Sequence, residues 1–521
     1  MRASRILAIS TAVVLLAACA SPKPLKREEL VEEGRDYLAR RTAEAGSLPP
    51  GWTLDAAVRR ALTSHLDYRI SRLEAAIATG NRKLASLDML PQLVAEAGYR
   101  QRSNVQASVS ESVDTGNVSL VPSTSSEQDS TDAQLYLNWD VVDFSMAYLR
   151  SRELGDTELA AEENRRRAVQ ATIRDVAYAW YQARAWQDLA PDLEALRGEV
   201  DAALKQSEEI VRQRLGDPLQ AVEYRSALLL VLRRIDSVTL QLDQSRDELA
   251  RILHLPAGAP VLVDPAGAPD MNTLTGLPSA DVRLWQSAAL VNRPEMRKTI
   301  YEARANNRAA RRQMLGVFPH LSFRYGANYD SNSFLVNNNW EQGSAQLSWN
   351  ILKLASIPGL RRDLRMNREL GQMRTEAMSA AVLSQVSIAD KAYRRNMSSW
   401  CFSKSLFDLN QRRSELLGAR SQAAAIDRLS LIRAQLDSLL LRTETGLQFA
   451  EYQKARMTLL ESAGLLDIPE ELQGEAFDRA LTALIAGNDS GPVRSELERV
   501  ASEFELSAPP AGSSTANGCM P

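Results

Sequence analysis

The stretch His320–Asp330 reads "HLSFRYGANYD" and differs from the sequence around it, which is rich in Ala, Leu, Arg and Glu and has the pattern of long helices. Within the stretch, apolar and aromatic residues occupy every second position, and mostly polar residues lie between them. A period of two predicts a β-strand with one apolar face and one polar face. Such a strand needs partner strands, so the rest of the chain has to supply them.

The chain contains one sequence pattern twice. The first part of the pattern recurs without a gap at an offset of 228 residues, which aligns Gly98 with Gly326. Its second part recurs at an offset of 210 residues, which aligns Trp139 in "LNWD" with Trp349 in "LSWN". Each copy reads helix, strand, polar loop, strand, very long helix, turn and helix. The predicted strands are about 92–102 and 132–141 in the first copy, and about 320–330 and 343–351 in the second.

The two copies set the expected domain boundaries. We expect a lipoprotein signal peptide at 1–18, an N-terminal anchor and linker at 19–52, a first repeat at 53–258, a linker at 259–280, a second repeat at 281–466, and a C-terminal tail at 467–521. The tail has a helical stretch and then a Pro-, Ser- and Gly-rich end that we expect to be disordered. Cys519 lies in that end without an evident partner, whereas Cys401 lies on a predicted helix, where we expect a small buried residue.

The N-terminus has the features of a bacterial lipoprotein signal. Arg2 and Arg5 precede an apolar run, Ile6–Ala18, which is too short to cross a bilayer of about 30 Å as a helix. The run ends in "LLAAC", which resembles the lipobox, where a peptidase cuts before a diacylated cysteine. By this resemblance Cys19 carries the lipid, and Ala20 after it favours the outer membrane. The alternative is an ordinary secretory signal that contains a cysteine.

Heptad seams predict two helical hairpins. Apolar residues step alternately by three and four positions at Leu228, Val231, Ile235, Val238 and Leu242. In the second copy the same steps occur, until the last interval, at Leu429, Ile432, Leu436, Leu439, Thr443 and Leu447. From Asp143 to Arg214 the only proline is Pro191, and a continuous helix there would be roughly 100 Å long. The turn "LGDPLQ" marks the first hairpin tip, and the second falls near "AAAIDRLSLIRAQLD". We expect the many Arg and Glu residues of these helices to be solvated.

The composition and the motif content exclude several functions. The chain has 521 residues, of which 45% are hydrophobic and 24% charged, and its net charge of −3 gives no sign of the basic surface that nucleic-acid binding needs. The three histidines lie far apart and no CxxC, HxxxH or HExxH spacing occurs, so we predict no metal site. Nucleotide-binding and nucleophile motifs are also missing from the sequence, so we predict no cofactor, no catalytic residue and no enzyme.

The combined pattern resembles the TolC-like outer-membrane efflux proteins over roughly residues 53–466. The resemblance rests on the duplicated order of helix, strands and helical hairpin, on "LPQL" and "FPHL" before the first strand of each copy, and on the tryptophan motif of the second strand. Cys19 resembles the lipidated cysteine of the lipoprotein branch. The fold that this implies is mainly α with a small β part. Long helical hairpins would form a periplasmic α-barrel, and four strands per chain would contribute to a trimeric twelve-stranded transmembrane β-barrel.

The resemblance also implies a function. The protein would be a homotrimer anchored in outer-membrane lipid, extending into the periplasm, and it would be the passive exit duct of a tripartite efflux or type I secretion system, working with a periplasmic adaptor and an inner-membrane pump. Six strand residues would face the water of the lumen, namely Glu96, Arg100, Asn138, Arg324, Asn328 and Asn350. Five would face lipid, namely Tyr99, Trp139, Phe323, Tyr325 and Trp349.

The helical tips depart from the family pattern. Many relatives carry aspartates near each tip that can form a constricting ring, but here Ala221 and Arg433 stand near those positions, with Asp427 close by. Asp427 and Arg433 are therefore our candidates for a periplasmic constriction. The alternative is that Arg433 is a solvated residue where a partner docks.

A different class of function is a lipid-anchored periplasmic coiled-coil scaffold without a pore. This alternative leaves unexplained why four amphipathic strands occur at matched positions in both copies.

Overall fold

A computed structural model describes residues 24–45, 49–64, 66–119, 121–212, 218–256, 259, 261–266, 268, 276–422, 428–466, 474–486 and 490–509. The helices are α2 (Arg27–Ala45), α3 (Leu54–Ser64), α4 (Leu66–Leu87), α5 (Val141–Gln187), α6 (Ala190–Arg212), α7 (Pro218–Ile252), α8 (Val282–Asn292), α9 (Pro294–Leu315), the 3-10 helix η1 (Ile351–Ser356), α10 (Ile357–Gln422), α11 (Arg428–Ser462), α12 (Glu475–Ala486) and α13 (Ser490–Glu503). The strands are β1 (Gln92–Gln101), β2 (Ala107–Ser108), β3 (Ser123–Thr124), β4 (Asp129–Asp140), β5 (His320–Asp330) and β6 (Asn339–Ser348). The expected signal peptide, Cys19, Asp427 and Cys519 lie outside the described residues.

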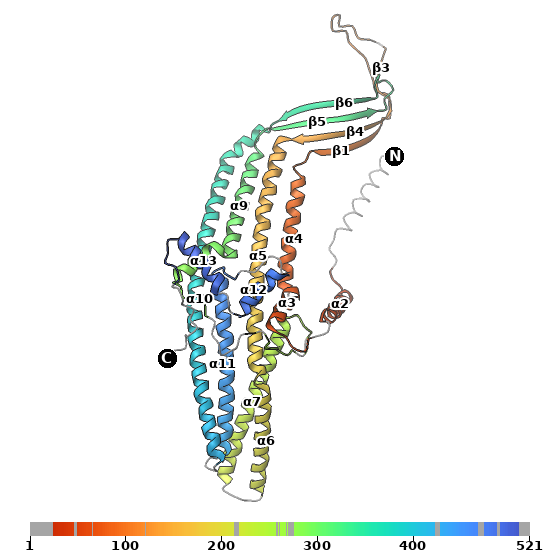
Figure 1. Cartoon of the computed structure of the whole chain (residues 1–521). Coiled ribbons are helices and arrows are strands. Elements are labelled where there is room, and N and C mark those ends of the chain that lie inside the picture. The colour runs from red at the N-terminus through yellow and green to blue at the C-terminus, as the bar shows by residue number, and fades with distance from the viewer. Residues whose placement is uncertain are drawn as a thin grey trace.

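The long helices run side by side, and the four-stranded sheet lies at one end of them (Figure 1). The lower ends of α6, α7, α10 and α11 lie together at the opposite end (Figure 1). The short helices α3, α12 and α13 lie around the middle of the molecule (Figure 1). This architecture confirms the predicted fold class, mainly α with a small sheet.

The four long strands form one antiparallel sheet in the order β1-β4-β5-β6. β5 coincides with the stretch "HLSFRYGANYD". β6 starts at Asn339, before the predicted start at 343, and it ends at Ser348, so Trp349 and Asn350 follow the strand. The ladder ends there because Ser348 pairs with His320, the first residue of β5, and Asn350 is the N-terminal cap position of η1. The polar loop between β1 and β4 contains a short ribbon of β2 and β3.

The long helix after β4 is broken into α5 and α6. α5 ends at Gln187 and α6 starts at Ala190, which places Pro191 in the first turn of α6. Proline has no N–H group to donate, so it fits the first turn of a helix and interrupts a continuous one. The counterpart in the second repeat, α10, runs unbroken for 66 residues.

The main core lies at mid-length, where the two repeats meet. Its largest buried side chains are mostly aromatic and come from both repeats, namely Trp180, Tyr181, Trp285, Trp400, Phe449 and Tyr452. The helices α12 and α13 of the tail add Phe477, Leu481 and Leu497 to this core. Part of the tail is therefore built into the fold. Cys401 is half-buried against the same core and is disulfide-bonded.

A second core holds the two helical hairpins together. The predicted seam of α7, from Leu228 to Leu242, is buried there against α6. Ile432 and Leu436 of α11 pack into the same cluster. The two hairpins therefore share one apolar core instead of standing apart.

The contact between α5 of the first repeat and α9 of the second repeat is ionic, which corrects the expectation that charges on these helices are solvated. Asp156 is 1% exposed and contacts the guanidinium groups of Arg304 at 2.7 Å and Arg308 at 3.1 Å. Closer to the sheet, Glu153 pairs with Arg312 at 3.2 Å. Partner numbers fall along α9 as they rise along α5, as an antiparallel helix pair requires.

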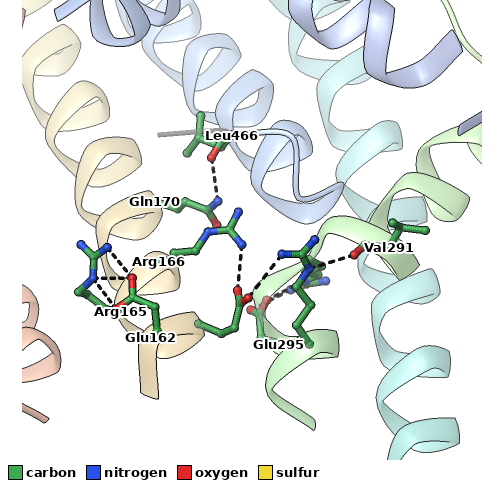
Figure 2. Close-up of polar contacts among 10 residues, drawn as sticks. Glu162, Arg165, Arg166, Gln170, Val291, Glu295 and Leu466 are labelled. Carbon is green, nitrogen blue, oxygen red and sulfur yellow. Dashed lines mark hydrogen bonds and ion pairs between the residues drawn. The ribbon is translucent and has the colours of Figure 1, made fainter. Parts of the chain in front are cut away.

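The ionic contacts continue toward the middle of the molecule (Figure 2). Buried Glu163 lies 3.6 Å from Arg297, and Glu295 lies 3.2 Å from Arg167. Figure 2 also shows further contacts of α5, namely Arg165 with Glu162 and Gln170 with the carbonyl of Leu466. Breaking a buried ion pair leaves a charge without compensation, which is strongly unfavourable. These pairs therefore fix how the two repeats meet.

Candidate functional site: the two-faced sheet and the helical tips

The register of the sheet keeps odd-numbered and even-numbered residues on opposite faces across all four strands. In one odd-numbered row, Leu137 lies opposite Leu93 of β1 and Tyr325 of β5, and Tyr325 lies opposite Gly343 of β6. Even-numbered residues form the matching rows on the other face. Because side chains alternate along each strand, the sheet has one odd face and one even face.

The even face is the more enclosed of the two, although it is polar. In the central strands β4 and β5, the even-numbered residues are buried or half-buried apart from Arg324. The odd-numbered residues of these strands are exposed apart from Ala133 and Leu321. On a curved sheet, side chains converge on the concave face and diverge on the convex face. We infer that the even face is the concave one.

Gly326 marks how tightly the even face is filled. It lies opposite Tyr136, and a Cβ atom on Gly326 would lie 2.5 Å from the Cβ of Tyr136 and 2.5 Å from the carbonyl oxygen of Leu135. Only glycine fits this close to the neighbouring strand. Its repeat counterpart, Gly98, is less restricted, because an added Cβ there would lie 2.9 Å from the two carboxylate oxygens of Asp132, which are the end of a side chain that can move.

Five of the six residues expected to face a lumen lie on the even face, namely Glu96, Arg100, Asn138, Arg324 and Asn328. Tyr136 joins two of them. Its hydroxyl donates a hydrogen bond of 2.7 Å to Glu96, and the guanidinium of Arg324 lies 3.4 Å from its ring centroid. Arg324 also donates to the Gln134 side chain at 3.0 Å. The prediction missed Tyr136, whose signal was an aromatic residue on the polar side of its strand.

Four of the five residues expected to face lipid lie on the odd face, namely Tyr99, Trp139, Phe323 and Tyr325. Trp139 stacks on Phe323 with ring centroids 6.3 Å apart and meets Phe144 of α5 edge-on at 6.0 Å. The fifth, Trp349, follows β6 and donates its indole N–H to the carbonyl of Val317 at 3.0 Å. Within the described part of the chain, no helix has the length and apolar character needed to span a membrane.

A polar cluster joins the sheet to α5. Asp140 accepts hydrogen bonds from the N–H groups of Val142 and Asp143, and so it caps the start of α5. Nδ1 of His320 lies 3.4 Å from Asp140 and 3.8 Å from Asp143. Among the described residues, only these three acidic and histidine side chains are close enough together to hold a metal ion. The Asp140 carboxylate is already engaged in capping α5, so we assign this cluster the structural role of joining β4 and β5 to α5.

The first turns of α7 and α11, which carry Ala221 and precede Arg433, lie at the end of the molecule opposite the sheet (Figure 1). Arg433 is exposed in the second turn of α11, and its neighbours Ile432 and Ala434 are buried. Ala221 is half-buried in the first turn of α7. The side chain of Arg433 therefore points away from the apolar core that the hairpins share.

No protein-family model matches this sequence, and no curated protein matches it either. Solved structures do match. The open state of the MtrE outer-membrane channel of Neisseria gonorrhoeae is similar with a TM-score of 0.60 and 17% sequence identity, over 79% of this chain and 89% of that chain. The chain has the TolC-like fold. The same TolC-like fold is found in two further matches, which differ from this chain in most residues.

The two further matches are the CmeC outer-membrane channel of Campylobacter jejuni and the outer-membrane protein VceC of Vibrio cholerae. CmeC has a TM-score of 0.60 and 12% identity, over 83% of this chain and 89% of its own. VceC has a TM-score of 0.57 and 13% identity, over 79% of this chain and 96% of its own. The TolC-like resemblance that the repeat predicted is therefore confirmed for the fold.

Proposed function

We propose that this chain is one subunit of a homotrimeric exit duct in the outer membrane. The observation that carries the proposal is a two-faced sheet with two unpaired edges. Among the described strands, β1 and β6 each pair on one side only. Open edges of this length invite pairing with another chain. Three copies would supply twelve strands and leave no edge, with the polar even face around the lumen and the apolar odd face toward lipid.

The helices support the same closure. Within one chain α4 packs on α5, α5 on α9, and α9 on α10, so α4 and α10 are the open ends of the row. Both carry exposed apolar residues, among them Leu66, Ile70, Leu73, Ile77 and Leu84 on α4 and Met366, Leu370 and Met373 in the part of α10 nearer the sheet. Contiguous apolar surface of this kind marks an interaction site. Neighbouring copies would cover it and close the helices into an α-barrel.

The duct would be passive, because a wide lumen makes few fixed contacts with its cargo. An inner-membrane pump would supply the energy, and a periplasmic adaptor would dock at the hairpin tips. Acyl chains on Cys19 would anchor each subunit in the outer membrane. Asp427 and Arg433 of three copies would form the periplasmic constriction.

Gel migration of outer-membrane fractions tests the proposal. An unheated sample should give a trimer-sized band that collapses to the monomer on boiling. Radioactive palmitate should label the wild type, and Cys19→Ser should abolish the label. A lipidated protein that migrates only as a monomer before and after heating would contradict the duct and favour the scaffold without a pore.

A further inference from the structure

We infer that α10 of one copy packs on α4 of the next copy in the register in which α5 packs on α9 within the chain, with an apolar seam in place of the ion pairs. The inference rests on the proposed ring of copies. The inference specifies which residues of neighbouring copies meet. It also predicts that the contact between copies is apolar, whereas the contact between repeats is ionic.

The internal repeat supplies the first step. α10 is the counterpart of α5, because at the offset of 210 residues the buried Thr172, Val176 and Ala179 align with three buried residues, namely Val382, Val386 and Ala389. α9 is the counterpart of α4 at the offset of 228 residues. The α5–α9 contact therefore has an equivalent in which α10 meets an α4. The chain's own α4 packs on α5 at the far end of the row, so this α4 belongs to a second copy.

The charges of the α5–α9 contact are replaced at the equivalent positions. The buried acids Asp156 and Glu163 correspond to Met366 and Met373. The bases Arg304, Arg308 and Arg312 correspond to small or apolar residues, namely Ala76, Gly80 and Leu84. Charged residues are retained toward the two ends of the contact, because Asp363, Asp67 and Arg69 occupy the positions equivalent to Glu153, Glu295 and Arg297. The middle of the contact between copies is therefore apolar.

The inherited register brings the exposed apolar residues of both helices together. Asp156 contacts residues 304 and 308 of α9, so Met366 should meet the α4 segment 76–80, beside Ile77. Along the two antiparallel helices, the next layers are Leu370 with Leu73 and Met373 with Ile70. All six side chains are exposed in the single chain, Met373 by 63% and Ile77 by 62%. Their three- and four-residue steps form a coiled-coil seam.

Rebuilding the ion pair of the repeat contact at the contact between copies tests the register. Met366→Asp places a carboxylate where the inference puts an apolar partner, and we expect at least a tenfold loss of the heat-modifiable trimer. Adding Ala76→Arg recreates the Asp156–Arg304 pair across two copies and should restore most of the trimer. As a matched control, Glu74→Arg puts the same base on another side of α4 and should not restore it. Circular dichroism should be unchanged in all variants, because residues 366, 76 and 74 are exposed in the single chain.

Photo-crosslinking gives a second measurement. With p-benzoylphenylalanine at Met373, the crosslinked peptide should contain Ile70 of α4. Two results would overturn the register but not the duct, provided that the wild type forms a trimer. One is a crosslink from Met373 to a site other than α4 near Ile70. The other is that Ala76→Arg and Glu74→Arg rescue Met366→Asp equally, or that neither rescues it. Absence of a wild-type trimer would instead overturn the proposed function.

Discussion

Gly326 on the concave face sets how closely β4 and β5 and their side chains can pack. Gly326 has no room for a Cβ atom because Tyr136 fills the space above it. We expect Gly326→Ala to cost about 1–3 kcal/mol, as overpacking does, and to lower the amount of heat-modifiable protein in the outer membrane. Gly343 lies in the same sheet, but a Cβ there would meet only the Tyr325 ring at an ordinary 3.6 Å. Gly343→Ala should therefore match the wild type, and equal losses in both variants would contradict this packing.

The buried hydroxyl of Tyr181 gives the mid-length core a dependence on alkaline pH. Burial raises the pKa of Tyr181 from 10.0 to about 12, although the charges of Arg456 and Arg184 oppose the shift. Between these two values the unfolded chain has lost the proton and the folded chain has kept it, so stability falls as pH rises through this window and is unaffected below it.

Denaturant unfolding of the purified protein, followed from neutral pH to about pH 12, measures this effect. Tyr181→Phe should remove up to about 2 kcal/mol of the alkaline loss, at 1.36 kcal/mol per pKa unit. Tyr37→Phe, on the exposed helix α2, should leave the loss as it is. Parallel pH curves for the wild type and Tyr181→Phe would contradict the assignment.

At the scale of the strands, the alternation of faces predicts opposite effects for the same substitution. Arginine at Phe323 or Leu347 on the odd face should impair insertion, because a lipid-facing arginine costs about 2–4 kcal/mol near the bilayer midplane. Arginine at Asn328 or Ser348 on the even face should be tolerated, since water reaches the lumen. Outer-membrane yield and trimer formation measure both. If the odd-face and even-face variants behave alike, the odd face does not contact lipid and the even face does not line a lumen.

At the scale of the hairpins, Arg433 predicts the ion selectivity of the entrance. Three guanidinium groups around one axis would favour anions, with salt screening them over about 8 Å. Arg433→Asp should shift single-channel selectivity toward cations more than Arg324→Ser in the strands does, and Asp427→Ala should shift it toward anions. Unchanged selectivity in both tip variants would place the constriction elsewhere and leave Arg433 as a docking residue.

The sequence predicted best those elements whose sequence pattern depends only on neighbouring residues. The period of two in "HLSFRYGANYD" depends only on neighbouring residues, and β5 matches it. β6 was harder, because the asparagines before Trp340 favour a loop until pairing with β5 draws Asn339 into the ladder opposite Tyr329. The break before α6 depends on Pro191 alone, which was visible in the sequence.

The ionic contact between α5 and α9 could not be read from either helix by itself. A charge run on one helix is normally solvated, and Asp156 is buried only because α9 brings Arg304 and Arg308 against it. The pairing of the two helices is the information that was missing. For the same reason Tyr136 did not stand out until β1 and β5 placed Glu96 and Arg324 on either side of it.

At the scale of the whole molecule, the repeat predicted the architecture because each copy brings the same order of elements to the same places. The tail was less predictable, since its helices show their role only by adding Phe477 and Leu497 to the mid-length core. The two ends of the helix row and the two edges of the sheet point to the same conclusion. One chain is an open segment, and we propose that neighbouring copies complete it.

Thiol modification during single-channel recording tests most directly that the even face lines a water-filled duct. Wild-type protein and the variants Asn328→Cys and Ala327→Cys would be recorded in planar bilayers while a charged, membrane-impermeant methanethiosulfonate is added. Asn328 faces the proposed lumen, and Ala327 is its neighbour on the odd face. We predict stepwise current loss in Asn328→Cys, up to three steps per trimer, and steady current in the wild type and Ala327→Cys. An absence of pores in every sample, or a loss in Ala327→Cys with none in Asn328→Cys, would contradict the account.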